Sequence, residues 1–442
     1  MLNMAYSLLI CMFISAIRFS LLFFFSRGNG LHVLEAVGAC MPPFQILIVA
    51  ITWATTQGFS FRAAHYFSNQ EFKNLGLILN KAILLNTFLG LVLFLVMFFF
   101  GCQILSIVLE NEQALSSLDT LIKWFSIGTP FAALNNVSIK YYSVTQEAMQ
   151  VMISSLVGLV VQVIFSLIFV TGFGWIEGGI GLAHSLGAIA YALYCVYIFI
   201  YYNPYPTAVV PMKWDETMDG FWEFTYYSLP LGIIVFIGYM SNELLQILAL
   251  TIDEFTFSCY SVLQSLIGIT YLIGECITLV NNVYLNYALA SKKYDYLSTV
   301  FITSNVIILI YSLVVSTICA FFMKEIVHLY TDKIEVILLL SSLTIWFILV
   351  QALQTFNGFL AESLSVLGHN SVPLVTQILG RYIIFIMLTI IFNQASNMGT
   401  HSVIIACFIG LAFAHLVIFS FCIFKIQEIQ QRSKEVEEEK NK

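Results

Sequence analysis

Two apolar stretches, half a chain length apart, are related to each other in sequence. Residues 118–141 read LDTLIKWFSIGTPFAALNNVSIKY, and residues 340–363 read LSSLTIWFILVQALQTFNGFLAES. A shift of 222 residues brings Trp124-Phe125 onto Trp346-Phe347. Because the chain of 442 residues has only six tryptophans, a Trp-Phe match at half its length indicates an internal duplication.

The register of this duplication continues without a gap from about Leu75 to about Ile168. The same shift pairs these further residues: Leu75 with Leu297, Ile104 with Ile326, Asn135 with Asn357, Ser143-Val144 with Ser365-Val366, and Gly158 with Gly380. A duplicated unit with an even number of spans inserts both copies in the same orientation, so the halves are expected to be parallel repeats. Two such bundles facing each other would enclose a cleft at mid-membrane depth, which is an architecture for alternating access.

The composition predicts a membrane protein. The chain is 60% hydrophobic and 10% charged, with a mean hydropathy of +0.90, whereas soluble domains carry roughly 25% charged residues. Its apolar runs are long and continuous rather than alternating, which favours helices over a β-barrel. Since a helical span needs about 20 residues, the length predicts an all-α integral membrane fold with twelve transmembrane helices.

The expected spans define the predicted domains. They cover residues 4–26, 34–59, 77–100, 118–141, 149–172, 178–202, 221–250, 255–287, 297–323, 336–364, 373–392 and 401–425. The predicted division is an N-terminal six-helix lobe (1–203), a cytoplasmic linker (204–220), a C-terminal six-helix lobe (221–425) and a charged cytoplasmic tail (426–442).

The loops predict the orientation. Lysines and arginines gather in the loops on the side of the two termini, among them Arg62, Lys73, Lys292 and Lys293, and in the tail. The positive-inside rule therefore places both termini in the cytoplasm. The plasma membrane and a vacuolar or other endomembrane are both compatible with this pattern.

Several chemistries lack a sequence signature. The nine cysteines are spread singly, without a CxxC pair or a Cys/His cluster, so neither a metal site nor a disulfide framework is expected. There is no Walker motif for ATP, and no nucleophile with a base at one membrane face. We therefore expect no enzyme, no cofactor and no nucleic-acid partner, but a monomer in the lipid bilayer.

Short segments, in order along the chain, carry a family resemblance. They are residues 30–38 (GLHVLEAVG), 64–76 (AHYFSNQEFKNLG), 172–183 (GFGWIEGGIGLA), 213–230, and the turns 141–146 and 368–370. Together they resemble the multidrug and toxic compound extrusion (MATE) family, in its eukaryotic branch, over roughly residues 1–425. The resemblance implies two six-helix lobes in a V. It also implies antiport, with small organic compounds, often cationic and aromatic, exported against entry of H⁺ or Na⁺.

The resemblance also implies coupling carboxylates in the second lobe. Glu243 matches the second acid of the family's Glu-Trp-Trp-x-x-Glu segment, while Gly238 and Gln354 stand where the family has two other acids. Glu275, in the middle of the eighth span, is an additional acid. Ionisable residues inside a membrane are costly and mark functional sites by default, so Glu243 and Glu275 are the candidates for proton or cation coupling, with Glu275 replacing a lost acid. The alternative for each is a hydrogen-bonded structural acid.

Other polar residues are candidates for the substrate cavity: Gln354, Asn135, Asn282, Tyr239 and Tyr271. Helix–helix hydrogen bonding is the commoner use of buried asparagines. Arg18 in the first span has two possible positions, the outer interface or the cleft, where it would discourage cations.

Two functions from one wider superfamily fit these features. The first is a secondary-active exporter of small organic compounds driven by H⁺ or, with less support, Na⁺. The alternative is a flippase for lipid-linked saccharides, whose anionic pyrophosphate would need basic residues in the cleft. Convergence of Arg18, Lys81 and Arg381 would favour the flippase.

Overall fold

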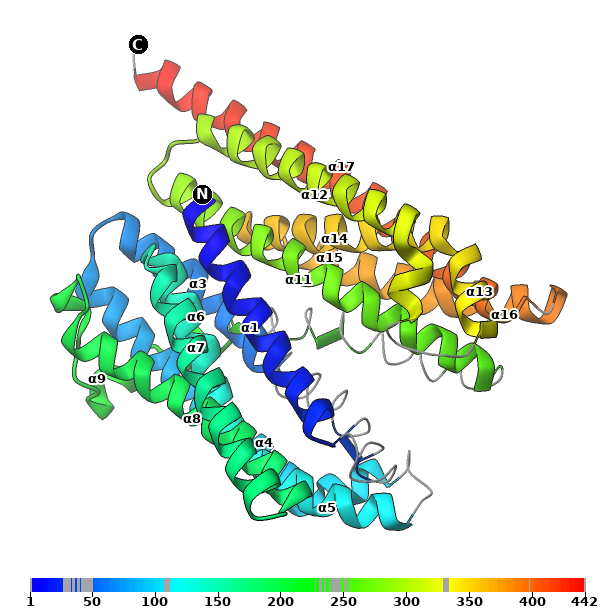
Figure 1. Ribbon diagram of the computed structural model, residues 1–442. Coiled ribbons are helices and arrows are strands. Elements are labelled where there is room, and N and C mark those ends of the chain that lie inside the picture. Colours follow the sequence, from blue (N-terminus) through cyan, green and yellow to red (C-terminus); the bar gives the residue numbers. More distant parts are fainter. Residues whose placement is uncertain are drawn as a thin grey trace. The chain divides into compact units, whose positions relative to one another are not determined.

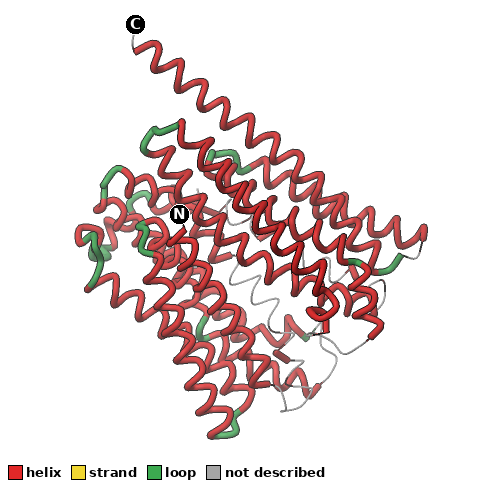
Figure 2. The backbone as a smooth tube through the Cα atoms, turned by 45° about the horizontal axis from the view of Figure 1, so that its top comes forward, coloured by secondary structure: helices red, strands yellow, loops and turns green. Residues whose placement is uncertain are grey.

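The structure is a computed structural model of the chain. It describes all residues except 1, 27–32, 34–35, 38–39, 41–50, 107–111, 227, 230–232, 234–235, 238–239, 241–247, 250–251, 253, 329–333, 397 and 441–442. The chain divides into two compact units, unit 1 (Met1–Phe236) and unit 2 (Ile237–Lys442). Helices make up nearly all of the described backbone (Figure 2), and eight of them are long and apolar enough to cross a membrane.

Unit 1 is a bundle of long helices (Figure 1). They are α1 (Leu2–Ser26), α3 (Ile51–Ser68), α4 (Phe72–Leu105), α5 (Glu112–Ser126), α6 (Thr129–Val144), α7 (Ala148–Ser166) and α8 (Ile176–Tyr201), with a π-helical turn, η2 (Leu167–Gly172), after α7. The predicted span 118–141 is interrupted between α5 and α6. Pro130 lies in the first turn of α6, where its missing N–H costs nothing. The core gathers side chains of α1, α4, α5 and α8 around Phe125.

Unit 2 repeats this plan. Its helices are α11 (Glu254–Ala290), α12 (Asp295–His328), α13 (Ile334–Ser342), α14 (Thr344–Val366), α15 (Ser371–Gln377), η4 (Ile378–Ile384, a π-helical turn), α16 (Phe385–Ser396) and α17 (Thr400–Lys440). The predicted span 336–364 is likewise divided, at Leu343, into α13 and α14. The charged tail continues α17 as helix to Lys440.

The duplication is visible in the packing of each unit. In unit 1, α7 and α8 cross backbone to backbone, because a Cβ on Gly158 would lie 2.8 Å from the carbonyl oxygen of Gly187. In unit 2, a Cβ on Gly380 would lie 2.6 Å from the carbonyl oxygen of Gly410. The residues of the two crossings correspond under the shift read from the sequence, with one extra residue before Gly410.

An asparagine bond accompanies each crossing. Asn135 Nδ2 in α6 donates to the carbonyl of Ala188 in α8 at 3.2 Å. Asn357 Nδ2 in α14 donates to the carbonyl of Leu411 in α17 at 2.9 Å. The same residue in both copies therefore joins the same pair of helices.

Residues 203–219, called the linker strap here, are fastened to unit 1. Asn203 Nδ2 donates to Tyr141 Oη at 2.9 Å, and the Tyr205 ring stacks on Phe72 with centroids 4.8 Å apart. Asn80 of α4 donates to the carbonyl of Val210 at 3.1 Å. Within the strap lie the short elements η3 (Pro206–Ala208) and α9 (Trp214–Met218).

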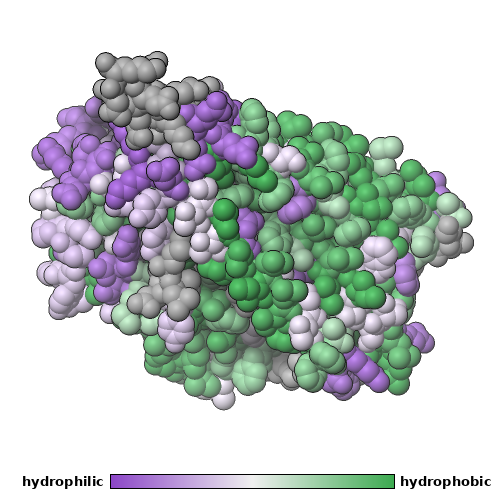
Figure 3. Space-filling view, turned by 90° about the horizontal axis from the view of Figure 1, so that it is seen from above, coloured by the Kyte–Doolittle hydropathy of each residue, from purple (hydrophilic) through white to green (hydrophobic). Residues whose placement is uncertain are grey.

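The surface carries the signature of a lipid solvent. Large apolar side chains on α12 face outward, among them Ile302, Leu313 and Phe321, the last 74% exposed. In Figure 3 hydrophobic residues cover much of the face in view, and hydrophilic residues gather toward one side. Such an exposed apolar area is expected where the solvent is hydrocarbon, and the predicted all-α membrane fold is confirmed.

Candidate functional site

Glu275 lies at the interface between α11 and α14 in unit 2. Its side chain is buried, with 8% of the residue exposed. The preceding residue, Gly274, brings the two helices together, since a Cβ there would meet the side chain of Thr355. Among the residues that the structure describes, none makes a hydrogen bond or an ion pair with the Glu275 carboxyl. It is therefore a buried acid to which no described residue offers a counter-charge.

Two predicted cavity residues flank the same interface. The Tyr271 hydroxyl packs on Gly358 of α14, where a Cβ would lie 2.7 Å from its oxygen. Gln354, which precedes Thr355 on α14, is 9% exposed. The structure thus brings Glu275, Gln354 and Tyr271 to neighbouring positions of one helix pair.

A second polar layer lies about two turns further along α11. Asn282 Nδ2 donates to the carboxylate of Glu362 in a very short contact. Asn281 Nδ2 donates to Ser363 Oγ at 3.1 Å. The Asn282 amide nitrogen thus serves a helix–helix contact, and a role for Asn282 in a substrate cavity stays a prediction.

Three sequence candidates fall elsewhere. Asn135 belongs to unit 1, where its amide joins α6 to α8, so it is not one of the residues gathered around Glu275, and its cavity role also stays a prediction. Glu243 and Tyr239, together with Gly238, lie outside the described residues.

Arg18 occupies neither of the two positions that the sequence leaves open. It is buried inside unit 1, 7% exposed, between α1, α7 and α8. Its Nε donates to Gln162 Oε1 at 2.9 Å, and an Nη donates to the carbonyl of His184 at 3.3 Å. Gln162 Nε2 returns a bond to the Arg18 carbonyl at 2.7 Å. Gln162 and His184 offer polar partners at the depth of Arg18, so the side chain does not need to extend to the interface.

A second buried cation of unit 1 was not among the predicted site residues. Lys140 in α6 is 1% exposed. Its Nζ donates to Gln57 Oε1 at 3.2 Å and lies 4.1 Å from the centre of the Trp53 ring. The available signal was the register of the duplication, which pairs Lys140 with the charged Glu362 of unit 2.

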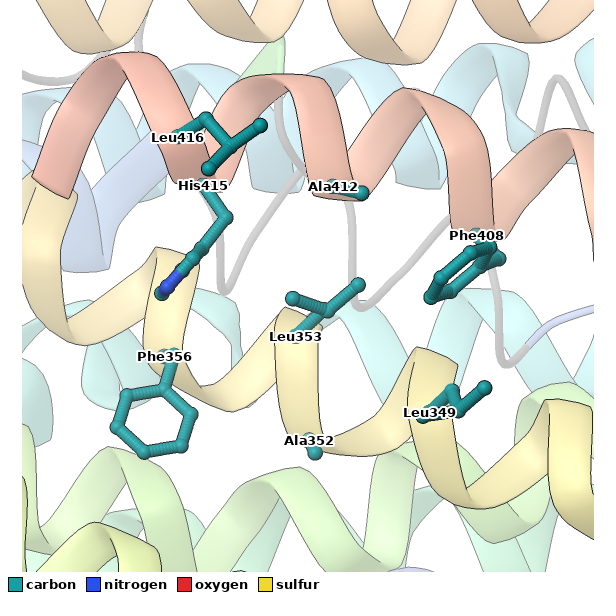
Figure 4. Close-up of a pocket in the computed structure, with 8 residues that line it drawn as sticks. All are labelled: Leu349, Ala352, Leu353, Phe356, Phe408, Ala412, His415 and Leu416. Atoms are coloured by element: carbon teal, nitrogen blue, oxygen red, sulfur yellow. The ribbon is translucent and has the colours of Figure 1, made fainter.

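An apolar groove of about 390 Å³ lies between α14 and α17 in unit 2. Its walls are Leu349, Ala352, Leu353, Phe356, Phe408, Ala412, His415 and Leu416. Figure 4 shows His415 reaching from α17 toward Phe356 of α14, and its Nδ1 lies 3.2 Å from Asn357 Oδ1. Apart from His415, the side chains that line the groove are apolar. Within the described ranges, no group of three or more His, Cys, Asp or Glu residues could hold a metal ion.

Known proteins resemble this chain first in fold and then in sequence. An outward-facing multidrug resistance MATE family transporter of the MOP superfamily shares the fold with a TM-score of 0.87 at 16% identity, over 97% of this chain and 96% of that one. The eukaryotic MATE transporter AtDTX14 does so with a TM-score of 0.85 at 14% identity, over 98% and 97%. The chain therefore shares its fold with these two proteins.

The sequence comparisons agree with the fold. The MatE family model matches residues 6–168. A probable multidrug resistance protein NorM from Bacillus anthracis is 19% identical over 286 residues, which are 64% of this chain and 62% of the relative's length. The chain is therefore similar in sequence to the MatE family over residues 6–168, and it spans less than two thirds of the length of the NorM relative.

Proposed function

We propose that this chain is a secondary-active antiporter that exports small organic compounds, cationic and aromatic ones above all, in exchange for H⁺. The observation that carries the proposal is the buried Glu275 carboxyl, which no described residue neutralises. An ionisable side chain buried within membrane-spanning helices marks a functional site by default.

In this proposal a proton and an organic cation bind the same Glu275 carboxyl and exclude each other. With the acid protonated, the site is neutral and releases a cation; with the proton gone, the carboxylate attracts one. Tyr271 supplies an aromatic face next to Glu275, and such a face adds about 0.5–2 kcal/mol for a bound cation. Gln354 places an uncharged polar side chain at the same helix interface. Glu243 would add a second acid to the same function.

The test is transport in liposomes with an imposed pH gradient. Purified protein is reconstituted, and accumulation of ethidium is followed by its fluorescence with the gradient, without it, and with a Na⁺ gradient instead. The expected result is uptake that follows the pH gradient and falls at least about tenfold in Glu275→Gln. A tenfold lower rate corresponds to a transport barrier that is higher by only about 1.4 kcal/mol.

The matched control is Glu335→Gln, an exposed acid at the start of α13 in the same unit. It should transport as the natural chain does. Uptake that ignores both gradients, or that persists unchanged in Glu275→Gln, contradicts the coupling role. Uptake driven by a Na⁺ gradient alone would mean that the coupling ion is Na⁺ and not H⁺.

Protease accessibility of tags at the two ends tests the proposed cytoplasmic termini, and light scattering tests the proposed monomer.

A flippase for lipid-linked saccharides is the second candidate, favoured by the two cations buried in unit 1, Arg18 and Lys140. The two cations have different partners, however: Gln162 and His184 contact Arg18, and Gln57 and Trp53 contact Lys140. Translocation of a fluorescent pyrophosphate lipid in the same liposomes, without any ion gradient, would establish this function.

A further inference from the structure

Arg18 carries a buried charge, and no described residue of unit 1 forms an ion pair with it. Its described partners are the Gln162 side chain and the His184 carbonyl, both neutral. A buried guanidinium is costly to keep without a counter-charge, and it carries five N–H donors. Two of these are used in the bonds that the structure shows.

A second donor lies next to it without a suitable acceptor. Tyr191 of α8 is 3% exposed, and among the described residues its hydroxyl finds no hydrogen-bond partner. The hydroxyl interacts with Arg18 and with the Cys11 and Cys195 thiols, and a thiol is a weak hydrogen-bond partner. A Cβ on Gly158 would lie 3.2 Å from Tyr191 Cβ and 3.5 Å from an Arg18 Nη, so both side chains pass the same glycine.

The Arg18 guanidinium packs directly on the crossing of α7 and α8. At Gly187 of unit 1, a Cβ would lie 2.9 Å from an Arg18 Nη. At the corresponding Gly410 of unit 2, the nearest side-chain atom is Cβ of Phe385, at 3.6 Å. Gln162 Cβ of α7 also lies 3.0 Å from the Cβ position of Gly187, so the side chain of unit 1 that matches Phe385 is Gln162 and the guanidinium is an additional group at this crossing.

We propose that Arg18 and Tyr191 form a binding site for a small monovalent anion within unit 1. The two side chains present N–H and O–H donors, so only an acceptor can satisfy them, and the positive charge selects an anion among acceptors. A free halide and the carboxylate of an organic compound share this chemistry. The site is separate from Glu275, and its occupancy can be measured without any transport.

The experiment measures thermal unfolding of the purified full chain in detergent at constant ionic strength. Sodium chloride and sodium acetate are each titrated against sodium methanesulfonate. A ligand that binds only the folded state raises Tm with saturation, and we expect a rise of at least about 3 °C. Saturation with chloride identifies a halide site, and saturation with acetate alone identifies a carboxylate site.

Three variants decide the assignment. Arg18→Met keeps the length of the side chain and removes the charge, so it should fold and show no anion-dependent rise. Tyr191→Phe should weaken the apparent affinity about fivefold, which corresponds to one hydrogen bond of about 1 kcal/mol. Lys81→Gln, a cation of α4 in the same unit, should respond as the natural chain does. The proposal is overturned if neither anion raises Tm of the natural chain. It is also overturned if Arg18→Met responds fully or, should that variant not fold, if Tyr191→Phe binds the anion unchanged.

Discussion

The two units share their packing and differ in the sign of their buried charges. Among the described residues, unit 1 buries the cations Arg18 and Lys140, whereas unit 2 buries the acid Glu275 and half-buries Glu362. Lys140 and Glu362 even stand at the same place in the duplicated register. Each is met by a side-chain amide, Lys140 by Gln57 and Glu362 by Asn282.

This difference shows which parts of a duplicated bundle are held fixed. A glycine at a backbone crossing has no alternative, since any side chain would enter the neighbouring helix. An asparagine bonded to a backbone carbonyl keeps its role for as long as the helices cross there. A charge met by a neutral amide can change sign, because an amide offers a donor to an anion and an acceptor to a cation.

The largest expected effect comes from filling a crossing. Gly158→Leu in unit 1 and Gly380→Leu in unit 2 should each lower the free energy of unfolding by more than about 4 kcal/mol, because the new Cβ would overlap a backbone carbonyl. The measurement is the fraction of monodisperse protein after detergent extraction. Gly268→Leu is the control, since nothing lies within 4 Å of its Cβ position. If only one crossing were sensitive, the two units would not be packed alike.

Reversing a charge should have an intermediate effect. Lys140→Glu gives unit 1 the charge sign of unit 2 and should cost about 3 kcal/mol, because it places a carboxylate against the Trp53 ring in place of a cation. Urea unfolding followed by circular dichroism measures the loss. Lys140→Met, which removes the charge and keeps the length, should cost less than about 1 kcal/mol. Equal losses in the two variants would mean that the sign of the charge does not matter there.

The smallest effect is expected for the asparagines. Asn135→Leu and Asn357→Leu should each cost about 1 kcal/mol, the contribution of one interhelical hydrogen bond. The same unfolding measurement should give similar values for both, since both side chains donate to a backbone carbonyl. Asn305→Leu on α12, whose amide bonds within its own helix, should change less. A large loss for one asparagine alone would limit the shared packing to the glycine crossings.

The sequence predicts more of the fold than of the candidate site. The Trp-Phe match at half length leads to the duplication, and continuous apolar runs lead to the helices. The breaks at 127–128 and at Leu343 are not predicted, because composition measures hydrophobicity over a window and not the direction of a helix axis. The burial of Arg18 depends on Gln162 and His184, which lie 144 and 166 residues away, so no local pattern contains it. Glu275 is found because an acid in a long apolar run stands out by itself.

The linker strap also bears on how a gene for this protein could be divided in two. A cut at the end of α8 would take residues 203–219 away from Tyr141, Phe72 and Asn80, to which they are fastened. The backbone turns at Gly220, which has a φ of +62°, a value that glycine adopts more easily than other residues. The strap therefore belongs to the first half of the gene. If the protein is made as two polypeptides, the division is best placed just after Gly220.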